Sequence, residues 1–155
     1  LDVGGSMDPH VRVVEELFSA ARAEFRHLEY YYFHNCIYEG LWRDNARRWE
    51  AQTPTGDVLR TYSGDYKAIF VGDAAMSPYE ILHPGGANEH YNAETGETWL
   101  HRLRQQWPQN VWINPLPQAH WCYTQSVGLI SEIFEGRMVP MTLDGIAQAA
   151  RLLGR

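Results

Sequence analysis

The stretch LDVGGSMDPH (residues 1–10) places an acidic residue, two glycines and a serine between a short apolar start and a predicted helix. Asp8 and Pro9 mark the start of that helix, because aspartate accepts hydrogen bonds from the first helical N–H groups and proline suits the first helical position. Polar residues between a strand and a helix are typical of a nucleophile, a phosphate-binding loop or a metal site. The remainder of the chain is needed to choose among these three.

The composition predicts a single folded domain over residues 1–155. This length is sufficient to enclose a core, and 45% hydrophobic with 21% charged residues is ordinary for a globular protein. The net charge of −6 argues against nucleic acid and anionic membranes as partners. Few cysteines, and apolar runs shorter than the roughly 20 residues of a membrane span, lead us to expect a cytoplasmic protein. Only Leu1 precedes Asp2, so we also expect the parent protein to supply upstream residues of the first strand.

Strand-like and helical segments alternate along the chain. The strand-like segments YKAIFVGD, NVWINPLP and RMVPMT are separated by helical patterns at residues 95–107 and 124–134. LEYYYFHNCIYEGLW predicts a hairpin that turns at His34 and Asn35. Thr142 is expected to cap a final helix, with an inward face of Leu143, Ile146, Ala147, Ala150 and Leu153. We expect an α/β fold, three-layer and doubly wound, with a mostly parallel central sheet and one antiparallel edge strand.

Four oxygen-bearing side chains fall near the carboxyl ends of these predicted strands. Asp2 and Ser6 follow the first strand, Thr53 precedes a helix, and Asp73 ends the strand YKAIFVGD. Doubly wound sheets bind ligands at this edge, and oxygen donors are the ligands that Mg²⁺ and Mn²⁺ prefer. Mg²⁺ also retains water readily, so one coordination position can stay open to another molecule. The set therefore predicts a Mg²⁺ or Mn²⁺ site.

A serine hydrolase is the alternative of a different class. Ser6, Asp73 and His120 occur in the serine, acid, histidine order of α/β-hydrolases. Against this, Asp8 stands where the nucleophile elbow has its second glycine. The glycine patterns of phosphate-binding loops do not match this stretch either.

Zinc is a further alternative, because His34 with Cys36 and His120 with Cys122 form two similar pairs of zinc-ligand types. The expected sheet places two strands between the pairs, and neighbouring strands lie about 4.8 Å apart. The four side chains therefore cannot all lie within the roughly 2 Å of one ion that zinc ligands require. Packed thiols and hydrogen-bonded histidines account for these residues more simply.

Asp2-x-Gly4-x-Ser6, then Thr53 in TPTGDVL and Asp73 in IFVGDAAM, resemble the metal-ion-dependent adhesion site of von Willebrand factor A domains over nearly the whole chain. The resemblance implies that Ser6 and Thr53 bind the ion directly, while Asp2 and Asp73 hold it directly or through water. The family's usual D-x-S-x-S has a hydroxyl where this chain has Gly4. A water is then expected to replace that ligand, and Gly4→Ser is expected to tighten binding; a degenerate, empty site is the alternative.

The segments YYFHNCIYEGLW, GDAAMSPYEI and WINPLP also resemble the bacterial CoxE-like branch of this family. Its members are intracellular, and their relatives act beside MoxR-type AAA+ ATPases in maturing or remodelling other proteins. The resemblance implies an adaptor that engages a client or the ATPase through the metal and is not an enzyme.

The segment SPYEILHPGGANEHYNAETGE follows Asp73 and delays the next long predicted helix beyond the roughly 4–6 residues typical of such connections. Long loops at a binding edge often recognise a partner, although this one could also pack on its own domain. The residues expected to border the site and contact a partner are Tyr79, Ile81, Leu82, His83, His90 and Tyr91.

Overall fold

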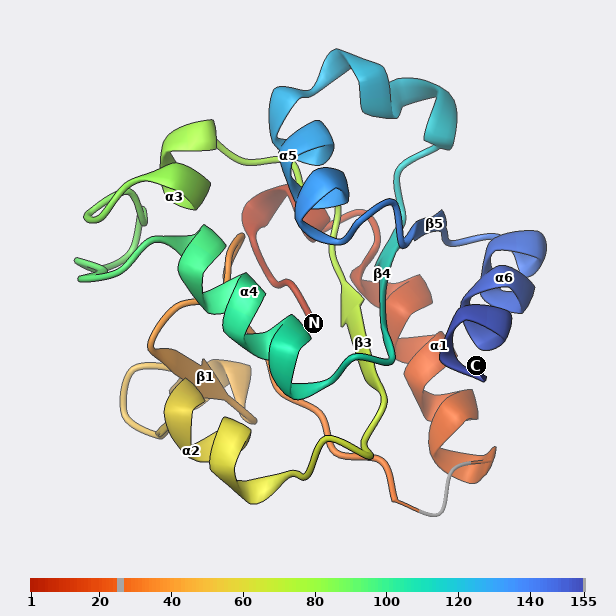
Figure 1. Ribbon diagram of the computed structural model, residues 1–155, viewed down its shortest axis with the longest axis horizontal. Helices are drawn as coiled ribbons and strands as arrows, with labels where there is room; N and C mark the ends of the chain where they lie inside the picture. The colour runs from red at the N-terminus through yellow and green to blue at the C-terminus, as the bar shows by residue number, and fades with distance from the viewer. Residues whose placement is uncertain (25–26, 155) are drawn as a thin grey trace.

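A small parallel sheet forms the centre of the computed structural model, which describes residues 1–24 and 27–154 (Figure 1). Its strands are β3 (Ala68–Val71), β4 (Asn110–Asn114) and β5 (Met138–Pro140), in the order β3-β4-β5. All five residues of β4 are buried, as expected for a parallel strand covered on both faces. A separate antiparallel pair is formed by β1 (Gly40–Trp42) and β2 (Gln52–Pro54). These strands confirm the prediction of a mixed α/β fold with parallel strands and an antiparallel pair.

Two short extended segments lie between the parallel sheet and the antiparallel pair. Residues 1–3 bond to β3 through Asp2 N–H and the Val71 carbonyl, 2.8 Å apart. They also pair in parallel with Phe33, whose N–H donates to the Leu1 carbonyl at 3.0 Å. Tyr32 in turn pairs antiparallel with Trp42 of β1. Backbone hydrogen bonds therefore continue from β5 through residues 1–3 and 32–33 to β2, and the hairpin predicted around His34 is present.

Helices pack on both faces of the parallel sheet. On one face α1 (Val11–Glu24) and α6 (Leu143–Leu153) cover an aliphatic cluster that includes Val71, Val111 and Val139. On the other face α2 (Thr55–Thr61), α4 (Gly96–Gln106) and α5 (Gln125–Ile133) cover a larger cluster that includes Phe70 and Trp112. Figure 1 shows α1 and α6 together on one side of β4, and α4 and α5 on the other. Neighbouring strand residues thus alternate between two cores, as the pleat requires.

Four short helical elements accompany these strands and longer helices in the described chain. They are the 3₁₀ helices η1 (Gly5–Met7), η2 (Asn45–Arg47) and η3 (Gln118–Tyr123) and the short helix α3 (Pro78–Leu82). The predicted start of α1 at Asp8 and Pro9 is wrong: Asp8 closes η1, and the helix begins at Val11. The segment after Asp73 is also not irregular throughout, because α3 forms within it. No described helix has the length and apolar character needed to cross a membrane.

The inward face of α6 differs from the predicted face. Thr142 caps this helix as predicted, since its Oγ1 accepts from Gly145 N–H at 3.1 Å. Of the predicted inward residues, Leu153 is buried and Ile146 is half-buried, but Leu143 is 92% exposed and Ala147 and Ala150 are also exposed. The buried positions are Gly145, Ala149 and Leu153. A Cβ at Gly145 would lie 1.8 Å from the Pro140 carbonyl oxygen, so the helix approaches β5 closely there. This contact turns Leu143 toward solvent.

Candidate functional site

Asp2 is a buried carboxylate at the end of the first extended segment. Its Oδ1 accepts two hydrogen bonds, from Gly4 N–H and Asn35 N–H, each at 2.8 Å. Its Oδ2 is buried and has no hydrogen-bond partner among the described residues. A Cβ at Gly72 would lie 3.1 Å from this Oδ2, so the unpartnered oxygen faces the end of β3. A buried anionic oxygen without a donor is costly, and a cation beside it would compensate.

Asp73 follows β3 and is also buried. Its Oδ1 accepts from Ala75 N–H at 2.9 Å, and its main-chain carbonyl accepts from the Asn114 amide at 2.9 Å. The next residue, Ala74, has a φ of 56°, in a region that L residues seldom adopt. The Ser126 hydroxyl donates to the Ala74 carbonyl at 2.7 Å. This turn is therefore held rigidly by β4 and α5, which fixes the Asp73 carboxylate.

The two carboxylates lie close enough to interact. Burial raises the pKa of Asp2 to about 6, hydrogen bonds from Gly4 and Asn35 oppose that rise, and the nearby charge of Asp73 adds to it. Two carboxylates that share a buried site repel each other. This repulsion is a second reason why the arrangement would gain from a divalent cation.

The position of these carboxylates in the sheet is typical of a ligand site. After residues 1–3 the chain leaves through α1 on one face of the sheet, and after β3 it leads to α4 on the other face. Asp2 and Asp73 therefore follow adjacent parallel segments whose connections diverge. In open α/β sheets a crevice forms at the strand ends where the connections separate, and ligands bind there.

The two predicted hydroxyl ligands lie on separate elements, and neither is bonded to the aspartates. Ser6 lies in η1 and is exposed, on the turn that follows Asp2. Thr53 is half-buried in β2, where it pairs with Leu41. Within the described chain, no hydrogen bond joins Ser6 or Thr53 to either aspartate. The neighbouring Thr55 is fully buried, and its hydroxyl donates to the Tyr38 carbonyl at 2.5 Å.

The segment after Asp73 folds over this edge. Tyr79 is 60% exposed, Tyr91 77% and Leu82 38%, and His83 and His90 are also exposed. Ile81 does not fit the expectation that it borders a partner site, because it is fully buried in the larger core. The amphipathic turn of α3 explains this difference, since Ile81 points inward when Tyr79 and Leu82 point outward.

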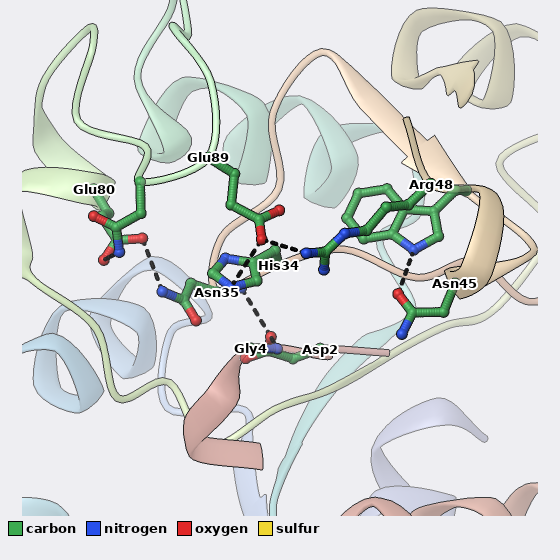
Figure 2. A network of polar contacts seen from close by, with 10 residues as sticks. Asp2, Gly4, His34, Asn35, Asn45, Arg48, Glu80 and Glu89 are labelled. Atoms are coloured by element: carbon green, nitrogen blue, oxygen red, sulfur yellow. Dashed lines mark hydrogen bonds and ion pairs between the residues drawn. The ribbon is translucent and has the colours of Figure 1, made fainter. Parts of the chain in front are cut away.

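Asn35 and Glu80 form a polar link between this segment and Asp2 (Figure 2). The Asn35 amide nitrogen donates to Glu80 Oε2 at 3.0 Å. Glu80 is buried, and its other oxygen accepts from the Asn88 amide at 3.1 Å and from Ser77 N–H at 3.3 Å. Beside them, Glu89 accepts from Arg48 at 2.7 Å and lies 3.5 Å from His34. Sequence reasoning missed Asn35 and Glu80 as parts of the site.

One local signal could have identified Glu80. Ser77-Pro-x-Glu80 is a capping-box pattern with proline at the first helical position, and the structure forms both reciprocal hydrogen bonds of that box. Asn35 has no comparable signal, because its role depends on contacts with residues far away in sequence.

The residues of the alternative hydrolase and zinc sites do not come together in the structure. His120 is exposed in η3, where the centroid of its ring lies 6.4 Å from that of Tyr123. Within the described chain, no hydrogen bond connects His120 to Ser6 or Asp73. Cys36 is buried and Cys122 is exposed. Among the described residues, no three histidine, cysteine, aspartate or glutamate side chains gather as a metal cluster. The expected site has only two carboxylates and depends on neutral oxygens for its other ligands.

These donors suit a hard divalent cation. The set consists of oxygens, includes an unpartnered buried carboxylate oxygen and contains no nitrogen or sulfur ligand. Comparison with known proteins adds nothing further: no family model matches the chain, and no curated protein or solved structure is significantly similar to it.

Proposed function

We propose that this chain is a von Willebrand factor A-type domain, three-layer and doubly wound, that binds partner proteins through a divalent metal ion. The observation that carries the proposal is the unpartnered, buried Oδ2 of Asp2, in a segment that hydrogen-bonds to β3 at the edge where Asp73 follows that strand and the chain connections diverge. The order of the extended segments, read across from β1 to β5, supports it, because it is the order of doubly wound folds.

Asp2, Ser6, Thr53 and Asp73 would hold Mg²⁺ or Mn²⁺ in this proposal. When bound, the ion supplies an open coordination position suited to a carboxylate of the partner. The chain's own residues orient the two aspartates through the backbone N–H groups of Gly4, Asn35 and Ala75. The site contributes binding and no catalysis.

The exposed side chains above the site would select the partner. Tyr79, Leu82, His83, His90 and Tyr91 lie on the segment that follows Asp73, and two of them are large exposed aromatics. The sequence resemblance to the CoxE-like branch favours a cytoplasmic adaptor that acts with a MoxR-type AAA+ ATPase or its client.

A pull-down from the source cell tests this function. We expect a specific AAA+ ATPase or client to bind the wild type in Mg²⁺, and to be lost in EDTA and in Asp73→Asn. The asparagine keeps an oxygen for Ala75 N–H but removes the charge. Asp144→Asn is the matched control, because Asp144 is exposed on α6, and it should retain the partner.

A partner retained equally in EDTA and by Asp73→Asn would contradict metal-dependent binding. Labelling of Ser6 by a fluorophosphonate probe, lost in His120→Ala, would instead favour the hydrolase alternative.

A further inference from the structure

Position 4 has glycine for a reason other than backbone conformation. Gly4 has φ −60° and ψ 155°, an extended conformation that any residue can adopt. Space is the constraint: a Cβ at Gly4 would lie only 2.0 Å from the Asn35 side-chain oxygen, Oδ1. That separation is far below a normal contact. The Asn35 oxygen therefore occupies the volume that a serine side chain at position 4 would need.

The Asn35 amide is oriented so that its oxygen, and not its nitrogen, faces Gly4. Its nitrogen donates to Glu80, and because an ionised carboxylate only accepts hydrogen bonds, this contact fixes which end of the amide faces Glu80. Glu80 is itself held by Asn88 and Ser77. Among the described residues, no hydrogen-bond donor contacts Asn35 Oδ1. Asn35 Oδ1 is thus a fixed acceptor oxygen that remains available to a ligand.

The backbone of Asn35 places this oxygen at the same edge as Asp2. Asn35 has a φ of 56°, a conformation in which asparagine is enriched, and its N–H donates to Asp2 Oδ1 at 2.8 Å. Figure 2 shows Asn35 between Glu80 and the Asp2–Gly4 turn. The same residue therefore holds one oxygen of Asp2 and directs its own oxygen toward position 4.

We propose that the Asn35 amide oxygen supplies the metal ligand that Gly4 cannot, so the turn at residues 34–36 completes the site. The inference rests on the proposed function, since it assigns a ligand to the same metal. Asparagine carbonyl oxygens bind hard divalent cations, and they differ from a serine hydroxyl in that they accept hydrogen bonds but cannot donate one. Glu80 acts as a positioning residue that fixes the direction of this amide.

Calorimetric titration with Mn²⁺ tests the role of Asn35. Asn35→Gly removes the side-chain amide, and glycine tolerates the positive φ at this position. We expect this variant to bind Mn²⁺ about tenfold more weakly or worse, because losing even a residue that only orients the ligands typically lowers metal affinity by about that factor. Asn45→Gly is the matched control: it makes the same substitution at an exposed asparagine of η2 that contacts Trp42 and neither Asn35 nor Glu80, so its affinity should match the wild type. Circular dichroism checks that each variant folds.

Position 4 provides a second and independent arm. Gly4→Ser alone should not tighten Mn²⁺ binding, because its side chain would collide with Asn35 Oδ1. This reverses the expectation from sequence that the added hydroxyl tightens binding. In the double variant Gly4→Ser with Asn35→Gly the space is free, and the serine hydroxyl should recover much of the affinity lost in Asn35→Gly.

The outcomes separate this inference from the proposed function. Wild-type affinity in Asn35→Gly, together with loss of binding in Asp73→Asn, would overturn the role of Asn35 and leave the metal site standing. Absence of Mn²⁺ binding by the wild type would overturn both. If Asn35→Gly fails to fold, Gly4→Ser alone decides, and tighter binding by that variant would show that position 4 was vacant.

Discussion

In the proposed site Asp2 combines a structural and a binding role within one side chain. Its Oδ1 satisfies the N–H groups of two separate segments, at Gly4 and Asn35, and its Oδ2, which has no partner among the described residues, would face the ion. These two tasks are coupled, because any substitution that removes the ligand oxygen also threatens the turn. Variants at this residue therefore need separate measurements of stability and of binding.

In EDTA, Asp2→Ala is expected to lower the free energy of unfolding by roughly 2 kcal/mol. Two buried N–H groups lose their acceptor, at a cost of about 1–3 kcal/mol each. Removal of the buried Asp2 charge offsets part of that cost. Asp2→Asn keeps one acceptor oxygen and should lose less. Urea denaturation measures both, with the exposed Asp8→Ala as control. Equal stability of Asp2→Ala and wild type would show that these hydrogen bonds contribute little.

At this scale the sequence predicted only some of the residues that make up the proposed site. Asp2 and Asp73 were identified because each ends an extended segment, and the end of a strand can be recognised locally. Asn35 could not be identified, because its side chain is defined by Gly4 and Glu80, which lie 31 and 45 positions away along the chain. Ile81 was misassigned to the surface, since exposure within a five-residue helix depends on the direction in which it docks.

At the scale of elements, strong apolar patterns were reliable guides. Residues 95–107 and 124–134 contain α4 and α5, and the predicted last strand contains β5. The face of α6 was predicted correctly at Leu153 and Ile146 but wrongly at Leu143, Ala147 and Ala150, because the alanines and leucines of this helix permit more than one inward stripe. The close approach of Gly145 to Pro140 selects one of them, and that contact lies outside any helical periodicity.

Two identical substitutions on α6 test its docking. Leu153 is 8% exposed and Leu143 is 92% exposed, so Leu153→Ala should cost about 2 kcal/mol or more and Leu143→Ala less than about 0.5 kcal/mol. Thermal or urea unfolding provides the comparison on one helix with one chemistry. A larger loss for Leu143→Ala would mean that α6 docks with Leu143, and not Leu153, facing the core.

At the scale of the whole molecule, the fold brings remote segments to one edge. Asp2 follows the first extended segment, Asp73 follows β3, and Asn35 comes from the turn between residues 33 and 36. The segment carrying Tyr79 and Tyr91 connects to this edge through Glu80 (Figure 2). A metal at this edge would link all of these segments to each other and to a partner.

Crystals grown in Mn²⁺ test this central claim most directly, because manganese gives an anomalous signal that identifies the ion. The account predicts an anomalous peak bordered by Asp2 Oδ2, Asp73, Ser6 and Thr53, with the Asn35 amide oxygen among its ligands. Crystals at saturating Mn²⁺ that show no peak at this edge, or a peak only elsewhere on the surface, would contradict it.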